Sequence, residues 1–295
     1  MELPEVYPLD ELPSHIFIDV PGFKNVNYKV TESKKLRLDS MPPTFREYRA
    51  AFEKAMAGIS HGNSYLLNLT FQSALDTNLT LEEVFQLSRA RYKLMVKDRF
   101  VVFSPECFVR IRDGNISSFP MKGTIDAGLP GAASLLLNDP KESAEHNTIV
   151  DLIRNDLAMV SEDVQVEKFK YLETVHTHKG DLLQMSSVVS GRLPENYRSQ
   201  LGDILMKLLP AGSISGAPKS STLQIIRNAE NYRRGFYTGI FGVFDGRNLN
   251  SAVMIRFIEK DNGRLFFKSG GGITSMSDPQ KEYEELIQKI YVPVA

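Results

Sequence analysis

The chain has a single cysteine, Cys107, among its 295 residues. One thiol cannot form a disulfide within the chain, and such sparse use of cysteine suits a reducing cytosol. An excess of positive charge is also absent, because 35 lysines and arginines face 36 aspartates and glutamates. The resulting net charge of −1 produces no basic field that would attract nucleic acid or an anionic membrane surface. We therefore expect neither as a partner.

Long apolar segments are missing as well. The longest mainly apolar runs, such as residues 132–137, are too short to span a bilayer. The first residues are acidic and have neither the basic nor the apolar region of a signal peptide. Hydrophobic residues make up 42% of the chain and charged residues 24%, which is typical of soluble globular proteins. The sequence thus predicts a cytoplasmic globular protein.

Short strand-like apolar segments alternate irregularly with segments whose apolar residues recur at helical spacing. Residues 44–59 carry apolar side chains at helical spacing, and glycines mark the end of this helix. Further helices are expected at 201–208 and 220–230 and from Asp139 and Asp278 onward. Strands are expected at 15–20, 65–71, 100–103, 107–112, 115–120, 169–175, 186–192, 237–244, 251–258 and 264–269. Hairpins interleaved with helices predict an α+β fold with antiparallel sheets. We expect one domain over residues 1–295, with residues 1–44 as a short N-terminal extension.

Two helix starts place pairs of glutamates on one helical face. Asp139-Pro140 and Asp278-Pro279 each provide an N-cap aspartate and a proline at the first helical position. Glu142 and Glu145 follow in the first helix, and Glu282 and Glu285 follow in the second, at a spacing of three. Such carboxylates either face solvent near the positive end of the helix dipole or lie buried, where they need a cation such as Mg²⁺.

Four other features suit an anionic ligand, although each also has an ordinary structural explanation. The glycine-rich segment 210–220 does not match the phosphate-loop motif, but it offers small residues and a helix start. Residues 269–273 would let the backbone approach a ligand closely. Lys122 beside a Gly-Thr turn is either a solvated lysine or, if buried, a nucleophile. Arg256 is either a surface residue or a carboxylate ligand.

Taken in order, these segments closely resemble the chorismate-binding enzyme family, which includes anthranilate, aminodeoxychorismate, isochorismate and salicylate synthases. The matching motifs are GNSYLLNL (62–69), SPE (104–106), PMKGT (120–124), KESAEHNTIVDLIRNDL (141–157), LPAGSISGAPK (209–219), RGFYTGIFG (234–242), VMIR (253–256), GGGI (270–273) and DPQKEYEELIQK (278–289). The resemblance implies a four-layer α/β/β/α sandwich of large, mostly antiparallel sheets.

The resemblance also implies roles for individual residues. Glu145 and Glu285 correspond to the direct ligands of Mg²⁺, with Glu142 and Glu282 beside them, and Glu106 corresponds to a general acid that protonates the departing 4-hydroxyl of chorismate. The residues implied to contact the carboxylates and hydroxyl of chorismate are Arg256, Tyr237, Gly271, Gly272, Lys289, Thr124, Ser213, Gly216 and Gln184.

Three positions favour the aminodeoxychorismate synthase branch. Lys122 stands where that branch carries a nucleophilic lysine and anthranilate synthases carry alanine. Leu66 stands where isochorismate and salicylate synthases carry a lysine that activates water, and leucine cannot act as a base. Gln184 stands where anthranilate and isochorismate synthases carry histidine. The resemblance thus implies amination of chorismate with ammonia to 4-amino-4-deoxychorismate, in the para-aminobenzoate and folate branch.

A glutaminase partner follows from what the chain does not contain. It has no G-x-C-x-G nucleophile motif, so we expect a separate glutaminase subunit to release ammonia from glutamine. Two alternatives remain at this point. One is an anthranilate synthase component I, and the other is a catalytically silent chorismate-binding protein.

Overall fold

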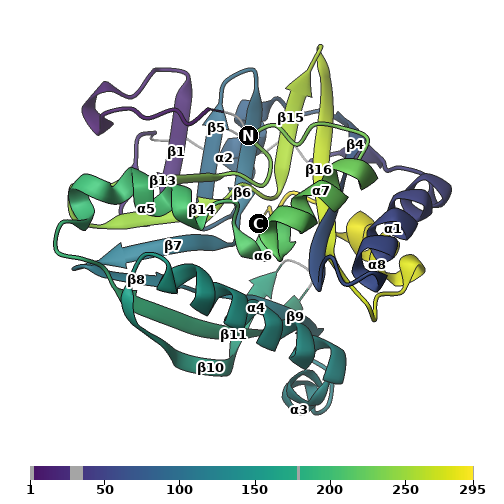
Figure 1. Cartoon of the computed structure of the whole chain (residues 1–295). Helices are drawn as coiled ribbons and strands as arrows, with labels where there is room; N and C mark the ends of the chain where they lie inside the picture. The colour runs from purple at the N-terminus through teal and green to yellow at the C-terminus, as the bar shows by residue number, and fades with distance from the viewer. Residues whose placement is uncertain (1–2, 27–35, 178–179, 295) are drawn as a thin grey trace. The chain divides into compact units, whose positions relative to one another are not determined.

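Two antiparallel sheets contain the strands of the computed structural model, which describes residues 3–26, 36–177 and 180–294 (Figure 1). The residue contacts divide the chain into unit 1, formed by Met1–Glu106, Ile214–Phe241 and Ala252–Ala295, and unit 2, formed by Cys107–Ser213 and Gly242–Ser251. Both units combine segments that are distant in the sequence. The predicted single domain over residues 1–295 stays a prediction.

The nine-stranded sheet has the order β12-β4-β16-β15-β6-β5-β1-β2, with β3 paired to β4. Its strands are β1 (Ile16–Val20), β2 (Phe23–Lys24), β3 (Leu38–Met41), β4 (Leu66–Thr77), β5 (Tyr92–Val96), β6 (Phe100–Ser104), β12 (Gly216–Ala217), β15 (Phe257–Asp261) and β16 (Arg264–Thr274). The helices of unit 1 are α1 (Phe45–Ser60), α2 (Leu81–Leu87), α7 (Lys219–Ala229), α8 (Pro279–Gln288) and the 3₁₀ turn η1 (Leu9–Glu11). The expected N-terminal extension therefore supplies three strands of this sheet.

The seven-stranded sheet has the order β10-β11-β8-β7-β14-β13, with β9 paired to β11. Its strands are β7 (Cys107–Arg112), β8 (Asn115–Ser118), β9 (Met121–Asp126), β10 (Glu162–Thr177), β11 (Gly180–Arg192), β13 (Ile240–Phe244) and β14 (Leu249–Val253). The helices of this part of the chain are α3 (Ala132–Asn138), α4 (Pro140–Ala158), α5 (Leu201–Leu208), the 3₁₀ turn η2 (Tyr197–Gln200) and the short α6 (Gly212–Ser215).

Local capping explains where the main helices begin. The hydroxyl of Thr44 accepts a hydrogen bond from the amide of Glu47, and the carboxylate of Glu47 accepts one from the amide of Thr44, so α1 starts with a capping box. Asp139 caps α4 and Asp278 caps α8, each followed by a proline as predicted. The apolar face of α1 packs with α7, α8, β4 and β16 around a core that includes Tyr48. This core holds α8 beside β16, where the candidate site residues of unit 1 lie.

Two of the predicted turns are tight hairpins that need left-handed backbone. Asp113 and Gly114 have φ of 50° and 81° between β7 and β8. Asn262 and Gly263 have φ of 48° and 78° between β15 and β16. Positive φ at both central residues is the geometry that Asp-Gly and Asn-Gly favour, because its twist matches that of the strands.

The structure corrects two predicted strands. The run 251–258 is not one strand, because Arg256 adopts a left-handed conformation with φ of 52° and separates β14 from β15, which belong to different sheets. The run 237–244 becomes a strand only at Ile240. The preceding residues form a turn, in which the amide of Gly239 donates to the carbonyl of Phe236 at 2.9 Å and Thr238 has φ of 66°.

Several elements were not predicted from the sequence. These are α2, α3, β5 and β9. For α2 a usable signal exists, because Thr80 and Glu83 form a second capping box. β5 has no alternating pattern, since all five of its residues are buried, and periodicity cannot distinguish such a strand from a buried helical segment.

Candidate active site

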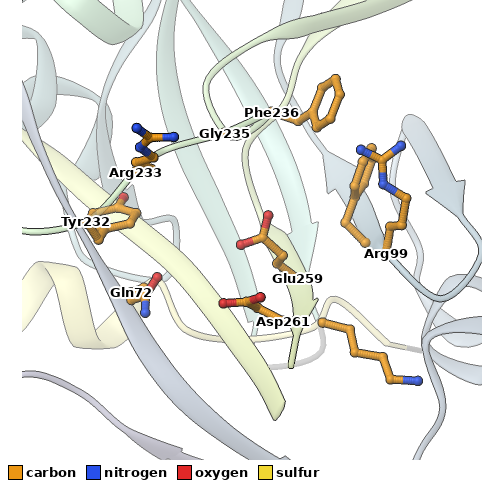
Figure 2. Close-up of a pocket in the computed structure, with 10 residues that line it drawn as sticks. Gln72, Arg99, Tyr232, Arg233, Gly235, Phe236, Glu259 and Asp261 are labelled. Atoms are coloured by element: carbon orange, nitrogen blue, oxygen red, sulfur yellow. The ribbon is translucent and has the colours of Figure 1, made fainter. Parts of the chain in front are cut away.

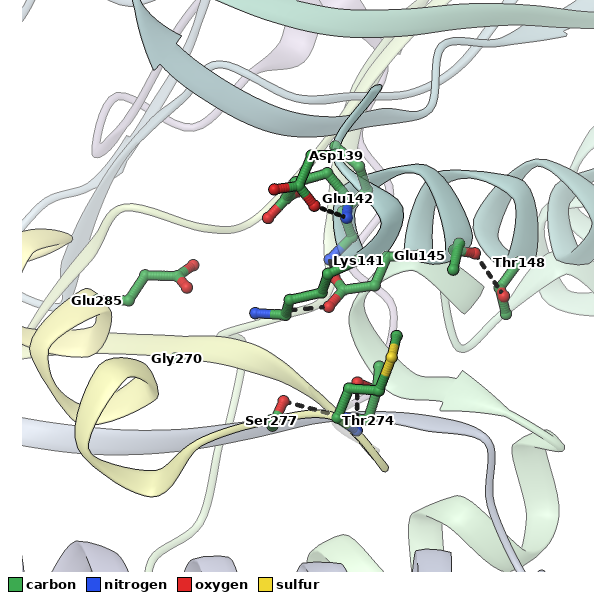
Figure 3. A network of polar contacts seen from close by, with 12 residues as sticks. Asp139, Lys141, Glu142, Glu145, Thr148, Gly270, Thr274, Ser277 and Glu285 are labelled. Carbon is green, nitrogen blue, oxygen red and sulfur yellow. Dashed lines mark hydrogen bonds and ion pairs between the residues drawn. The ribbon is translucent and has the colours of Figure 1, made fainter. Parts of the chain in front are cut away.

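The first group of predicted site residues gathers at the start of α4 in unit 2. Asp139 caps the helix by accepting a hydrogen bond from the amide of Glu142 at 2.9 Å. One turn further on, the side chain of Glu145 is 8% exposed and faces two ammonium groups. Lys141 Nζ lies 3.8 Å from Glu145 Oε1 (Figure 3). Lys122 Nζ lies 3.5 Å from Glu145 Oε2. Glu145 is therefore a buried carboxylate and not a solvated one.

Lys122 reaches this carboxylate because β9 runs against the start of α4. Gly123 has φ of 74°, and a Cβ there would lie 2.8 Å from Leu136 Cδ1 and 3.1 Å from Glu142 Oε2. Only glycine allows the backbone next to Lys122 to approach α3 and α4 this closely. The side chain of Lys122 is 23% exposed. Of the two alternatives for this residue, a solvated lysine and a buried one, the structure therefore favours the second.

The charge of Glu145 disfavours ionisation of Glu142. Burial raises the pKa of Glu142, and the charge of Glu145 raises it further, while Lys141 and Lys122 oppose the shift. A pair of partly dehydrated carboxylates with oxygen donors is a suitable environment for a hard divalent cation. The donor chemistry of this pair thus fits Mg²⁺.

His146, next to Glu145, was not singled out from the sequence. It is fully buried, its Nε2 lies 2.7 Å from Ser187 Oγ, and its Nδ1 has no hydrogen-bond partner among the described residues. Ser187 Oγ also accepts the amide of Lys170, which adopts φ of 51° in an irregular part of β10. His146 therefore connects α4 to both long strands of the sheet. No spacing signal in the sequence distinguishes it from a surface histidine.

Protonation of His146 should destabilise the protein in acid. Burial lowers the pKa of His146 from its ordinary value of 6.5 to about 4, with Lys170 and Lys122 adding to the effect. The pKa of His146 is lower in the folded protein than in the unfolded chain. The contribution of neutral His146 to the free energy of unfolding is therefore complete above pH 6.5 and is lost as the pH falls toward 4. It amounts to about 3 kcal/mol.

We therefore expect His146→Gln to show a flatter stability profile, because glutamine does not titrate. Its free energy of unfolding should fall about 2–3 kcal/mol less than that of the wild type between pH 7.5 and pH 4.5. Urea unfolding at both pH values measures this difference. Equal falls in the two proteins would contradict the prediction.

The remaining predicted residues of unit 2 lie on neighbouring strands or near α4. Thr124 of β9 and Gln184 of β11 are direct register partners. Ser213 is half-buried in α6, next to Gly212. A Cβ on Gly212 would lie 2.9 Å from Asp156 Oδ2, so α6 packs closely on the far part of α4.

The second group of predicted residues lies where α8 meets β16 in unit 1. Glu282 is 2% exposed, and Glu285 forms an ion pair with Lys289 at 2.5 Å. Lys289 Nζ also donates to the carbonyl of Gly270 at 3.0 Å. A Cβ on Gly271 would lie within 4 Å of Glu282, Glu285 and Lys289. The GGG segment of β16 thus faces the charged residues of α8, and Gly272 follows in register with Asn68 of β4.

Arg256, Tyr237 and Glu106 all belong to unit 1. The amide of Val253 donates to the carbonyl of Glu106 at 3.2 Å, and the carbonyl of Arg256 accepts the amide of Phe103 at 3.1 Å. The guanidinium of Arg256 lies 5.0 Å from the ring centre of Tyr291, and its buried Nε has no hydrogen-bond partner among the described residues. A guanidinium with a buried unsatisfied donor is suited to bind a carboxylate.

Tyr237 and Gly216 complete the predicted set. Tyr237 is 4% exposed, and burial raises the pKa of its hydroxyl, which is therefore protonated at neutral pH. Gly216 has φ of 110°, and a Cβ there would lie only 1.9 Å from the carbonyl oxygen of Leu66. Leu66 itself is buried in β4 at 3% exposure. Within the described residues no three histidine, cysteine, aspartate or glutamate side chains form a metal-binding group.

A separate cavity in unit 1 contains none of the predicted site residues. It has a volume of about 400 Å³ and lies between β4, β6, β15 and the loop after α7 (Figure 2). Its lining residues are Gln72, Arg99, Phe100, Tyr232, Arg233, Gly235, Phe236, Glu259, Lys260 and Asp261. Glu259 also pairs with the buried Lys268 at 2.6 Å. Sequence motifs did not indicate this cavity.

The fold is that of the chorismate-utilising enzymes. The solved structure of anthranilate synthase component I from Streptococcus pneumoniae TIGR4 matches with a TM-score of 0.73 and 30% sequence identity, over 86% of this chain and 58% of that chain. A sequence profile of chorismate binding enzymes matches residues 18–295. The chain therefore belongs to the chorismate binding enzyme family, and the predicted family and fold are confirmed.

Individual relatives carry different names. An "uncharacterized PabA-like protein" of Haemophilus influenzae is 50% identical over 294 residues, covering 99% of this chain and 89% of the relative. Aminodeoxychorismate synthase component 1 of Bacillus subtilis is 32% identical over 265 residues, covering 85% of this chain and 55% of that synthase. The chain thus spans little more than half the length of this synthase. None of the described helices is long and apolar enough to cross a membrane.

Proposed function

We propose that the chain aminates chorismate with ammonia to 4-amino-4-deoxychorismate. The observation that carries this proposal is the placement of Lys122. Its ammonium lies 3.5 Å from the buried Glu145, on a strand that Gly123 brings against the start of α4. A largely buried lysine beside a carboxylate at a family motif is suited to nucleophilic catalysis. The similarity to an aminodeoxychorismate synthase of Bacillus subtilis supports the same branch.

In the proposed reaction, the neutral amine of Lys122 attacks ring carbon 2 of chorismate. The ring double bonds shift, the bond from carbon 4 to its hydroxyl breaks, and Glu106 protonates the departing oxygen to give water. Ammonia then attacks carbon 4, the double bonds shift back, and the bond to Lys122 breaks. The new ammonium group at carbon 4 loses a proton, and this proton restores the acid form of Glu106. The sum is chorismate plus ammonia giving 4-amino-4-deoxychorismate plus water, and the lysine is regenerated.

Binding of the dianionic substrate is assigned to residues with complementary charge. Arg256, with its unsatisfied Nε, and the amides of the GGG segment are proposed to bind the enolpyruvyl carboxylate. Tyr237, protonated at neutral pH, would donate a hydrogen bond. The proposed contacts of Thr124, Gln184, Ser213, Gly216 and Lys289 with the substrate follow from the family resemblance.

Mg²⁺ is the proposed cofactor, with Glu145 and Glu285 as direct ligands and Glu142 and Glu282 beside them. The proposal is supported by the buried Glu145, by the raised pKa of Glu142 beside it and by the oxygen-only donor set. When bound, the ion would neutralise the ring carboxylate of chorismate and orient the ring. The ion would also offset the repulsion by which Glu145 raises the pKa of Glu142.

The nitrogen source gives a direct test of the proposed reaction and partner. The purified chain, supplied with chorismate, Mg²⁺ and ammonium, is expected to form 4-amino-4-deoxychorismate, identified by mass and by the absence of pyruvate. With glutamine in place of ammonium we expect no product, because the chain lacks a glutaminase nucleophile. Addition of a separate glutaminase subunit should restore the use of glutamine.

Two results would contradict this proposal. Formation of anthranilate and pyruvate would identify an anthranilate synthase, and absence of any product with chorismate still bound would identify a silent binding protein. Glutamine-dependent product from the isolated chain would refute the separate subunit.

A further inference from the structure

Glu145 carries two lysine partners, of which the proposed reaction uses only one. Lys122 comes from β9, whereas Lys141 comes from the first turn of α4, four residues before Glu145. The Lys141 side chain is 37% exposed, while that of Glu145 is 8% exposed. Lys141 therefore extends from solvent to the edge of a buried carboxylate.

The charges around the start of α4 explain why a second cation is useful there. Asp139, Glu142 and Glu145 place three carboxylates within the first two turns of α4, and among the described residues Lys122 and Lys141 are the cations that form ion pairs with Glu145 and oppose the raised pKa of Glu142. Lys141 acts on both glutamates, since it pairs with Glu145 and also opposes the raised pKa of Glu142. Without Lys141, Lys122 would be the one lysine left in an ion pair with the buried Glu145 among the described residues.

We propose that Lys141 is an internal counter-cation of the Glu142–Glu145 pair and competes with a divalent cation for Glu145. This inference rests on the proposed Mg²⁺ site. A lysine on a flexible stem can leave the carboxylate for solvent when a divalent ion arrives, because its charge is readily hydrated. In the absence of the ion, Lys141 keeps the pair partly neutralised. Lys141 thus lowers the affinity for the metal and stabilises the protein without it.

Lys141→Met tests both consequences. Methionine keeps the length and helix propensity of lysine but removes the charge. After treatment with EDTA, the variant should melt at a lower temperature than the wild type. Its dissociation constant for Mg²⁺, measured by isothermal titration calorimetry without substrate, should be roughly tenfold lower, because a unit charge about 4 Å from the ligand no longer opposes binding. Loss of a merely structural contact would lower the melting temperature but would not strengthen the binding of Mg²⁺.

Two further variants serve as controls. Lys141→Arg keeps the charge and should bind Mg²⁺ within about twofold of the wild type. Lys207→Met removes an exposed lysine of α5 in the same unit and should change neither property.

The possible outcomes separate this inference from the proposed function. If the wild type binds Mg²⁺ but Lys141→Met binds it equally or more weakly, the competition is refuted while the metal site stands. If neither protein binds Mg²⁺, both the metal site and the inference are refuted. An unchanged or raised melting temperature of Lys141→Met in EDTA also overturns the counter-cation role.

Discussion

Lys122→Ala is expected to lose at least about a thousandfold in the rate of aminodeoxychorismate formation, equivalent to about 4 kcal/mol of transition-state stabilisation. The physical reason is that no other described amine shares the position of Lys122 against the buried Glu145 on α4, apart from the half-exposed Lys141. The rate is measured with chorismate, Mg²⁺ and a saturating ammonium concentration. Binding of chorismate should persist, because the proposed carboxylate contacts remain.

A second variant separates the nucleophilic role of Lys122 from its ion pair. Lys122→Arg keeps a cation opposite Glu145, so its stability should be close to that of the wild type, but a guanidinium is not a nucleophile at neutral pH. It should be as inactive as Lys122→Ala. Lys168→Ala, which changes an exposed lysine of β10, is the matched control and should retain full activity.

The intermediate itself offers the sharpest evidence. When the wild-type protein meets chorismate without ammonia, mass spectrometry should find an adduct on Lys122. In Lys122→Ala, ammonia can attack carbon 2 directly and give some 2-amino product, because alanine is the residue of the anthranilate branch. If no adduct forms and Lys122→Ala turns over normally, Lys122 is a structural residue and the assignment to this branch fails.

Glu145→Gln and Glu285→Gln are each expected to reduce turnover by about a hundredfold to a thousandfold. Glutamine matches glutamate in size but provides a neutral and weaker ligand for Mg²⁺, so the loss should appear in metal affinity as well as in rate. Calorimetric titration of Mg²⁺ measures the first and the ammonium-dependent assay measures the second. The wild type should also lose activity in excess EDTA.

The fold should survive these changes, for a reason that differs between the two positions. Glu145→Gln removes the charge that raises the pKa of Glu142, and this relief offsets the loss of the ion pairs with Lys122 and Lys141. Glu285 is 46% exposed, so its pair with Lys289 contributes little to stability. Glu195→Gln, at an exposed position of unit 2, is the control. Wild-type turnover in either site variant, or full activity in EDTA, would refute the metal assignment.

The sequence by itself determined the features that depend on a few neighbouring residues. Asp139 and Asp278 predict helix starts because an aspartate followed by proline satisfies the first free amides of a helix. Asp113-Gly114 and Asn262-Gly263 predict hairpins because these residues tolerate positive φ. The ordered motifs from residue 62 to residue 289 were enough to identify the family. Each helix start, turn and motif can be recognised from a short segment of the sequence.

Only the tertiary structure decided which of these residues meet. Lys122 and Glu145 are 23 positions apart, and their pairing depends on Gly123 packing against Glu142, which no spacing rule predicts. The burial of His146 and the left-handed break at Arg256 also follow from packing between distant segments. Local propensity cannot anticipate such contacts, because the free energy that favours them comes from burying groups that are remote in the sequence.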